Sequence, residues 1–348
     1  MKKKKLLKIL IPILCVLLLA GSFGCYIWYH RQLHESKWLA EGDNAVEAKE
    51  YPGVLSELTM MDNTWQTAVP QTRIYELVKA HFESPLPEGK TAKKAIVIGY
   101  DGCRVDTFRL LPTARKSAIN LLLNDGGHAA FCYAGGANFP HPLRQNTDTS
   151  PGWCSMLTGE ISEKHHITGN LQRKEVEPKS LLLSLAEDGI VKKTAFYTTW
   201  SGFFVEKQAT YVLERQYIQK NHINAHFRWG IVDPITRLLT LADVKRKNCS
   251  DFIFTVFDYT DHAGHSTGFA PENPWYAGCF RDEEAAGEDI INAIRSRKTY
   301  DTEDWLILIS TDHGGNGSGH GGPSIEERII FIVSNKEILP AQATETTN

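Results

Sequence analysis

The sequence has few cysteines, and their spacing excludes two classes of protein. The chain has seven cysteines in 348 residues and no C-x-x-C pair. Cys15 and Cys25 lie in an apolar N-terminal run, and the remaining five are an odd number that cannot all pair within one chain. We therefore expect neither a zinc–thiolate site nor a disulfide scaffold.

The sequence also lacks a basic excess, internal repeats and low-complexity tracts other than its leading lysines. It has 38 Lys and Arg against 41 Asp and Glu, a formal net charge of -3. No broad positive charge is available to meet a phosphate backbone, so we expect no nucleic-acid binding. With 42% hydrophobic and 23% charged residues, the composition is typical of an ordinary globular protein of one large or two modest domains.

The N-terminus is the most asymmetric part of the chain. Lys2–Lys5 precede an almost uninterrupted apolar run, Ile9–Tyr29, which is long enough to cross a bilayer as one helix. Because basic residues stay in the cytoplasm, we expect a single-pass cell-membrane protein whose remaining chain is extracytoplasmic. A signal peptide cleaved near Ala20–Ser22 and a lipid-anchored Cys25 are the alternatives. Residues 1–30 are interpreted as the cytoplasmic lysine cluster and membrane anchor, and with each alternative the bulk of the protein still leaves the cytoplasm.

Residues 31–90 are interpreted as a spacer with some helix, and residues 91–348 as a catalytic α/β domain. In the spacer, residues 73–84 have apolar side chains at helical spacing before two prolines. Short apolar runs that alternate with helical segments predict a largely parallel, buried sheet. The strands are expected in residues 93–102, 192–200, 251–261, 304–315 and 328–335, and the helices in residues 180–190 and 282–297.

Three of the predicted strands end in a carboxylate. Asp101 ends KKAIVIGYD, Asp261 ends FIFTVFDYTD, and Asp312 follows WLILIST. A single such aspartate is usually only a turn former. Because the carboxyl ends of strands in an open α/β sheet line the ligand crevice, we expect these three side chains to converge.

Histidines accompany two of these aspartates. His265 follows Asp261 in DHAGH, and His313 and His320 flank the glycine-rich segment of DHGGNGSGHGG. Glycine lets the backbone approach closely, so side chains on such a loop can meet at one point. Since Asp and His are ligands of catalytic zinc, the pattern predicts a metal site rather than a loop of solvated histidines.

Thr149 begins the predicted helix TSPGWCSMLT. A hydroxyl there lies where backbone N–H groups and the helix dipole stabilise negative charge, which suits a nucleophile that attacks phosphorus. It is also the position of an ordinary helix N-cap. The segment alone does not decide between the two.

These motifs, taken in order, resemble the alkaline phosphatase superfamily, and most closely its nucleotide pyrophosphatase/phosphodiesterase branch. The resemblance extends from about Lys93 to Ser334 and rests on five segments: GYDGCRVD, TSPGWCSMLTG, HHITGN, DHAGHSTG and STDHGG. It implies an alkaline-phosphatase-like three-layer sandwich with a central, largely parallel sheet, preceded by the transmembrane helix.

The resemblance also implies two divalent metal ions, zinc or alternatively manganese. One would be held by Asp101, Thr149, Asp312 and His313, and the other by the set Asp261, His265 and His320. Two such ions can stabilise the attacking and leaving oxygens of an in-line displacement. Thr149 would then be the catalytic nucleophile and would form a phosphothreonine.

The implied function is that of an extracytoplasmic phosphodiesterase or nucleotide pyrophosphatase acting on a small phosphate ester or nucleotide-like substrate. A phosphoglycerol or phosphoethanolamine transferase, a phosphomonoesterase and an inactive surface binding module are the alternatives. A sulfatase is not expected, because that class needs Cys or Ser at the position of Thr149.

Two further groups near these motifs have structural interpretations. We expect Arg104 and Asp106 to form an ion pair. Aromatic residues that could line a leaving-group pocket are better explained as packed side chains; they are Trp153, Trp200, Phe203 and Tyr276.

Overall fold

The computed structural model describes residues 68–138 and 141–338. The segment predicted to cross the membrane, residues 9–29, lies outside them. The strands are β1 (Val69–Pro70), β2 (Ala92–Tyr100), β3 (His128–Tyr133), β4 (Thr194–Thr198), β5 (Ala225–Trp229), β6 (Phe252–Phe257), β7 (Glu303–Ser310) and β8 (Ile329–Ser334). The α-helices are α4 (Arg73–Glu83), α5 (Ala118–Asn124), α6 (Thr149–Thr158), α7 (Ser162–His165), α8 (Leu181–Glu187), α9 (Val212–Lys220), α10 (Asp233–Val244), α11 (Tyr259–Thr267), α12 (Pro274–Arg295) and α13 (Ile325–Arg328). Three 3₁₀ segments join them: η2 (Val105–Thr113), η3 (Ser201–Phe203) and η4 (Tyr300–Thr302).

The strands form one mixed sheet of eight in the order β1-β3-β8-β7-β2-β6-β4-β5. The run from β7 to β5 is parallel, as predicted for the centre of the sheet. By contrast, β8 is antiparallel to both β7 and β3, so the expectation of a largely parallel sheet holds only in part. The β7–β8 connection contains only the four-residue α13 and lacks the longer crossover helix that usually links parallel strands.

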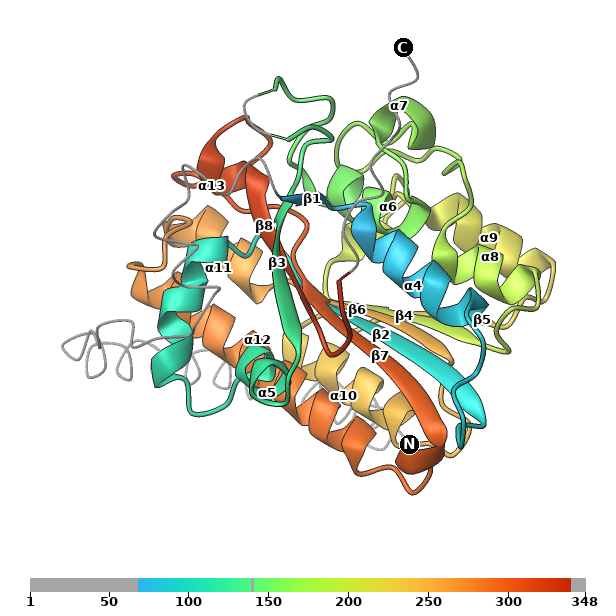
Figure 1. Ribbon diagram of the computed structural model, residues 1–348. Coiled ribbons are helices and arrows are strands. Elements are labelled where there is room, and N and C mark those ends of the chain that lie inside the picture. Colours follow the sequence, from blue (N-terminus) through green and yellow to red (C-terminus); the bar gives the residue numbers. More distant parts are fainter. Residues whose placement is uncertain (1–67, 139–140, 339–348) are drawn as a thin grey trace, which may run out of the picture. The chain divides into compact units, whose positions relative to one another are not determined.

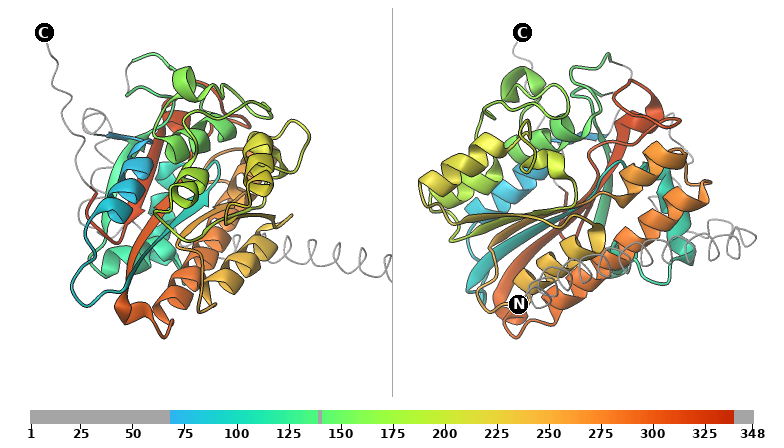
Figure 2. Two further views of the ribbon diagram at one scale, coloured as in Figure 1. Left: turned by 90° about the vertical axis from the view of Figure 1, so that its right-hand side faces the viewer. Right: turned by 180° about the vertical axis from the view of Figure 1, so that it is seen from behind.

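Helices cover both faces of the sheet (Figures 1 and 2). One face packs against α4, α6 and α8 through a core that includes Phe196, Phe252 and Leu308. The other packs against α5, α10 and α12 through a core that includes Ile96, Ile253 and Ile290. Because both faces of the central strands are covered, β6 and β8 are buried at every residue, which explains their continuous apolar runs.

Part of the predicted spacer, residues 31–90, belongs to this sheet and to the helices that pack on it. Val69–Pro70 pairs with β3, and α4 packs on β2 and α6 with Ile74 and Val78 fully buried. The helix predicted over residues 73–84 is therefore confirmed, and it packs in the same hydrophobic core as α6.

The order β7-β2-β6 brings three carboxyl ends together. Asp101 directly follows β2, Asp312 follows β7, and Asp261 lies in the first turn of α11 just after β6. Within residues 68–138 and 141–338, no helix is both long and apolar enough to span a bilayer.

Candidate active site

The first group of potential metal ligands consists of Asp101, Asp312 and His313. One donor atom from each of the three lies within 4.8 Å of the others, and all three side chains are buried. His313 Nε2 is 3.6 Å from Asp101 Oδ1 and 3.3 Å from Asp312 Oδ2. These residues follow the ends of two neighbouring strands, β2 and β7, as the strand-end argument predicted.

The second group lies beside the first and contains Asp261, His265 and His320. His265 Nε2 is 3.4 Å from Asp261 Oδ2, and His320 Nε2 is 3.8 Å from Asp261 Oδ1. Asp261, His313 and His320 also offer donor atoms within 4.8 Å of one another. The rings of His313 and His320 stack at 3.9 Å, so His313 borders both groups.

All three histidines direct the same ring nitrogen into this cluster. Nδ1 of His265, His313 and His320 lies within 3.0 Å of a backbone carbonyl oxygen, which can only accept. Each Nδ1 therefore carries the proton, and Nε2 presents a lone pair. The Nε2 atoms of His265 and His320 are only 3.1 Å apart, and two lone pairs cannot face each other at this distance unless a proton or a metal ion lies between them.

Two carboxylate oxygens also favour a bound cation at this site. Asp261 Oδ1 and Asp312 Oδ2 are buried and have no hydrogen-bond partner among the described residues. Burial raises the pKa values of Asp101 and Asp312 well above the ordinary value, and a neighbouring carboxylate adds to the rise, that of Asp261 for Asp101 and that of Asp101 for Asp312. A hydrogen bond to Asp261 raises the pKa of His265 to about 9, so positive charge is stabilised here. The donor set of carboxylates and imidazoles therefore fits divalent cations such as zinc.

Thr149 lies at the edge of the first group. Its Oγ1 is 3.3 Å from His313 Nε2 and 3.5 Å from Asp101 Oδ1, and the side chain is buried. Asp148 occupies the N-cap position of α6, so Thr149 is the first helical residue and not the cap. The N-cap alternative for Thr149 is therefore wrong, because its hydroxyl contacts the acid–histidine cluster instead.

The backbone at the start of α6 has few free donors. Pro151 has no N–H, the Gly152 N–H bonds the Asp148 carbonyl at 2.9 Å, and the Ser150 N–H bonds Asn170 Oδ1 at 2.8 Å. Asn170 belongs to the segment HHITGN, which the site prediction left out. This bond fixes the Asn170 amide beside Thr149, and its amide group supplies two N–H donors there.

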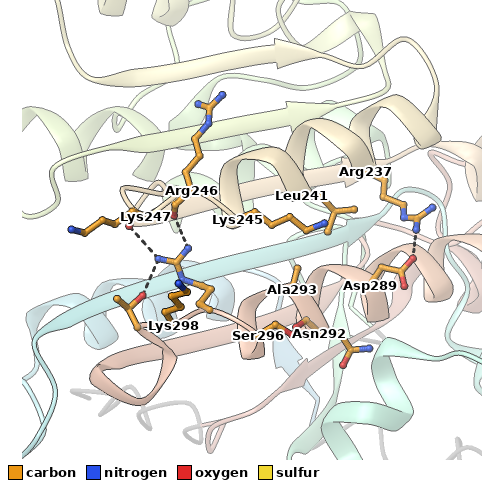
Figure 3. A pocket seen from close by; sticks show the side chains of 12 residues that line it. Arg237, Leu241, Lys245, Arg246, Lys247, Asp289, Asn292, Ala293, Ser296 and Lys298 are labelled. Carbon is orange, nitrogen blue, oxygen red and sulfur yellow. Dashed lines mark hydrogen bonds and ion pairs between the residues drawn. The ribbon is translucent and has the colours of Figure 1, made fainter.

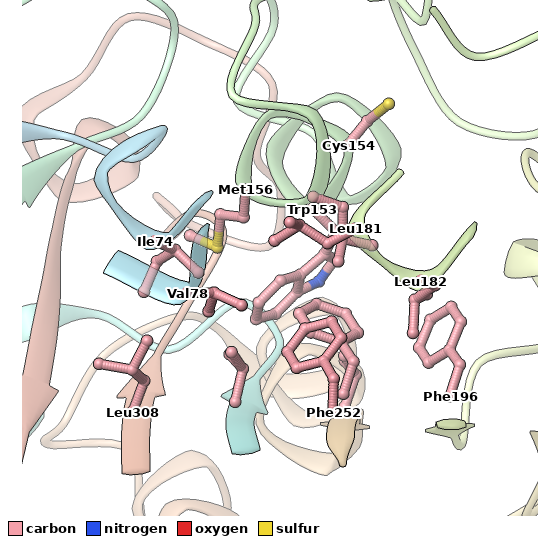
Figure 4. Packing of buried hydrophobic residues seen from close by; sticks show 14 of the residues in the cluster. Ile74, Val78, Trp153, Cys154, Met156, Leu181, Leu182, Phe196, Phe252 and Leu308 are labelled. Atoms are coloured by element: carbon pink, nitrogen blue, oxygen red, sulfur yellow. The ribbon is translucent and has the colours of Figure 1, made fainter. Parts of the chain in front are cut away.

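Trp153 holds one of the predicted ligands in place. Its indole packs between α6 and the sheet (Figure 4), and its Nε1–H donates to Asp101 Oδ2 at 2.9 Å. Gly99 makes room for the ring, because a Cβ at that position would overlap the indole. The sequence identified Trp153 as a packed aromatic, which is confirmed, but no sequence signal pointed to its hydrogen bond.

The turn after β2 also depends on glycine. Gly102 has φ of 64°, and a Cβ there would lie 2.5 Å from Asp261 Oδ1. Its N–H donates to Asp312 Oδ1 at 3.2 Å. Gly102 therefore allows the backbone to pass between two of the predicted ligands.

The remaining structural expectations agree with the packing. Arg104 Nε and Nη2 bond Asp106 at 3.0 and 2.7 Å, which confirms the ion pair. Phe203 and Tyr276 are fully buried, as expected of packed aromatics.

An α/β sheet whose strand ends carry buried aspartates and histidines around a hydroxyl is the arrangement of a metal-dependent ester hydrolase. Residues 95–320, more than half of the chain, match the type I phosphodiesterase / nucleotide pyrophosphatase family. The chain therefore belongs to this family of phosphoric ester hydrolases, and the resemblance inferred from the motifs is confirmed. No curated protein matches the chain by sequence.

Several solved structures resemble the chain at low identity. Murine ectonucleotide pyrophosphatase / phosphodiesterase 5 is 15% identical, with a TM-score of 0.46, over 64% of this chain and 57% of its own. Alkaline phosphatase from the Antarctic bacterium TAB5 is 12% identical, with a TM-score of 0.44, over 70% and 91%. Phosphonate monoester hydrolase of Agrobacterium radiobacter is 12% identical, with a TM-score of 0.46, over 70% and 68%. This chain thus spans little more than half of the murine protein's length.

Proposed function

We propose that this protein is a metal-dependent phosphodiesterase or nucleotide pyrophosphatase in which Thr149 is the nucleophile. The observation that carries the proposal is the position of Thr149 Oγ1, 3.3 Å from His313 Nε2 and 3.5 Å from Asp101 Oδ1. A buried hydroxyl at the edge of such a cluster is suited to forming a covalent intermediate.

Two divalent ions, with zinc as the first candidate and manganese as the second, would complete the site. Asp101, Asp312 and His313 would hold one with Thr149, and the set Asp261, His265 and His320 would hold the other. When bound, such ions stabilise the negative charge that develops on the attacking and leaving oxygens.

The protein's own residues would then perform the following steps. Thr149 gives up its hydroxyl proton to solvent and its oxygen attacks the phosphorus, while the bond from phosphorus to the leaving group breaks on the opposite side. The leaving group departs with the electron pair and takes a proton from solvent. Water then attacks the phosphothreonine and releases phosphate or a phosphomonoester from Thr149.

Asn170 is the proposed donor to a phosphoryl oxygen of the substrate. Its Oδ1 accepts from the Ser150 N–H at 2.8 Å, and this bond positions its amide N–H groups beside Thr149. We expect Asn170→Ala to lower kcat/KM by roughly 100-fold, the size of effect seen for a preorganised donor to developing charge.

The proposed substrate is a small phosphate ester of nucleotide type. This follows from the family, and a structure of murine ectonucleotide pyrophosphatase / phosphodiesterase 5 was obtained in complex with AMP. We further propose that the catalytic domain is extracytoplasmic and tethered by residues 9–29. Protease added to intact cells should degrade the domain, and protection of the domain until lysis would contradict this location.

The direct test of the activity is an assay of the purified chain with zinc or manganese. Bis-p-nitrophenyl phosphate and p-nitrophenyl phosphate are compared, and Thr149→Ala is the control. We expect faster hydrolysis of the diester and loss of nearly all turnover in Thr149→Ala. Equal turnover by Thr149→Ala would exclude Thr149 as nucleophile, and a preference for the monoester would assign the protein to the phosphatases.

A further inference from the structure

Helix α10 buries polar side chains and exposes apolar ones. Thr236, Thr240 and Asp243 face the protein interior, where each is almost fully buried and hydrogen-bonded. On the other side, Ile235 is 37% and Leu238 62% exposed. Among the apolar side chains of the helix only Val244 is fully buried, so the buried side of α10 is more polar than the apolar stripe by which a helix usually faces the core.

The loop before α10 enlarges this apolar surface. Trp229 is 39% and Ile231 53% exposed, and Gly230 between them packs against Thr236 of the helix. Nine large apolar side chains are exposed among the described residues, and four of them lie between Trp229 and Leu238. Because the four are concentrated on one helix and its entry loop, they form a patch and not scattered surface residues.

A basic groove of about 830 Å³ lies between the C-terminal halves of α10 and α12 (Figure 3). Six cationic side chains and one carboxylate line it. They are Arg237, Lys245, Arg246, Lys247, Arg297 and Lys298, with Asp289 as the acid.

Four of these cations are available to a ligand. Arg237 pairs with Asp289, and Arg297 pairs with Glu303 and donates to the Lys247 carbonyl. Within the part of the chain that the structure describes, no ion pair engages the other four, all of which are exposed; they are Lys245, Arg246, Lys247 and Lys298. The groove therefore carries a net positive charge that the surrounding protein does not neutralise.

The apolar patch and the basic groove share one face. Ile235, Leu238, Ala242 and Lys245 are spaced by three or four residues along α10, so they lie in one row on the helix, and all four are exposed. We call Trp229, Ile231, Ile235 and Leu238 together with the groove the α10 face. Exposed apolar side chains beside unpaired cations offer the two contacts by which helices bind a membrane interface, namely burial of apolar area and attraction to anionic lipids.

We propose that the α10 face binds the surface of a membrane that contains anionic phospholipid. The four apolar side chains enter the boundary between headgroups and acyl chains, and the four available cations meet lipid phosphates. This contact is independent of residues 9–29 and of the catalytic site, and it would fix how the domain lies on a bilayer.

The charge on the face argues against a second copy of the chain as its occupant. A two-fold symmetric dimer through this face would place each basic groove against the same surface of its partner. The like charges would repel, whereas an anionic headgroup layer neutralises them.

The test uses the full chain in nanodiscs of phosphatidylcholine, alone or mixed with phosphatidylglycerol. Trypsin cleavage after Lys245, Arg246 and Lys247 is compared with cleavage after Lys174, in a loop outside the α10 face. We expect the mixed lipid to slow cleavage at the first sites about tenfold or more, since each basic side chain strengthens attachment to an anionic surface several-fold. Cleavage after Lys174 should not change.

Two variants that keep the cleavage sites test the two halves of the face. The double variant Ile235→Ser/Leu238→Ser and the single variant Lys298→Glu should each lose most of the protection. Ile190→Ser, at an apolar residue that is 43% exposed elsewhere, should keep it. Equal cleavage in both lipids would overturn the proposal. Protection that appears only in a complex with a soluble acidic protein would also overturn it, and would assign the face to that partner.

Discussion

Two groups of buried acids lie next to α11, and their surroundings differ. Asp233 accepts from Thr199 Oγ1 at 2.5 Å and from the N–H groups of Asp258 and Tyr259, each at 3.0 Å. Glu283 likewise accepts from the N–H of Thr260 at 2.9 Å and from its hydroxyl. In the acid–histidine cluster, by contrast, two buried carboxylate oxygens, Asp261 Oδ1 and Asp312 Oδ2, have no hydrogen-bond partner among the described residues.

The difference separates a structural use of buried acids from a ligand-binding one. Donors from the protein satisfy Asp233 and Glu283, which fix the start of the helix that carries Asp261 and His265. Two carboxylate oxygens of the cluster lack such donors, and a buried charge without them is costly. A bound cation would satisfy these oxygens. Both groups consist of buried acids, so their hydrogen bonds, and not their residue types, distinguish them.

The largest expected effects come from replacing one acid in each group. Asp312→Asn should lower kcat/KM by about 1,000-fold, or about 4 kcal/mol of transition-state stabilisation, because it removes a proposed metal ligand. Glu283→Gln should mainly lower the free energy of unfolding, by about 1–3 kcal/mol, since one of the two oxygens that accept from Thr260 becomes an NH2 group. Steady-state kinetics and urea unfolding measure the two effects. Loss of stability without loss of activity in Asp312→Asn would contradict the assignment.

Glu214 is a further buried acid, and its raised pKa makes the stability of the protein depend on pH. It accepts from Ser180 Oγ at 2.5 Å, far from the cluster, and burial raises its pKa to about 7. The folded protein therefore retains a proton that the unfolded chain has lost, so stability from this group is full below pH of about 4 and falls as the pH rises to about 7. Glu214→Gln should remove this loss, about 3 kcal/mol between pH 4 and 8. Urea unfolding across that range measures it, and an unchanged slope would contradict the raised pKa.

The smallest expected effect concerns a hydrogen bond that a packed aromatic residue donates to the cluster. Trp153→Phe removes the Nε1–H that bonds Asp101 Oδ2 at 2.9 Å but keeps most of the buried ring. Loss of a hydrogen bond to a metal ligand typically weakens metal affinity or activity about 10- to 100-fold. Titration of activity with zinc should show the weaker affinity, while Trp200→Phe, which only packs on Phe203, should not. Equal zinc affinity in the two variants would mean that Trp153 only packs.

Much of the central sheet was predictable because its strands are continuous apolar runs. Two outer strands were not predicted, because β3 and β5 are partly exposed and their sequences HAAFCY and AHFRW lack such a run. Helix α10 was missed for a different reason, since the residues that it buries are mostly polar and Val244 is its only fully buried apolar residue. Its buried side therefore lacks the apolar periodicity that predicts a helix.

The site was predictable to the extent that single side chains mark strand ends. The structure brings Asp101, Asp261 and Asp312 together with the three histidines, because parallel neighbouring strands end at one edge. The roles of Trp153 and Asn170 depend on contacts between α6 and segments 52 and 20 residues away, respectively, which no local pattern records.

The most direct test of the central claim is the metal content of the cluster. Crystals of the protein grown with zinc are measured by anomalous diffraction at the zinc edge. The account predicts two peaks, one among Asp101, Asp312 and His313 and one beside Asp261, with the second retained when Thr149 is replaced by Ala. A cluster that binds no metal at saturating zinc, in a folded and crystalline protein, would contradict the account.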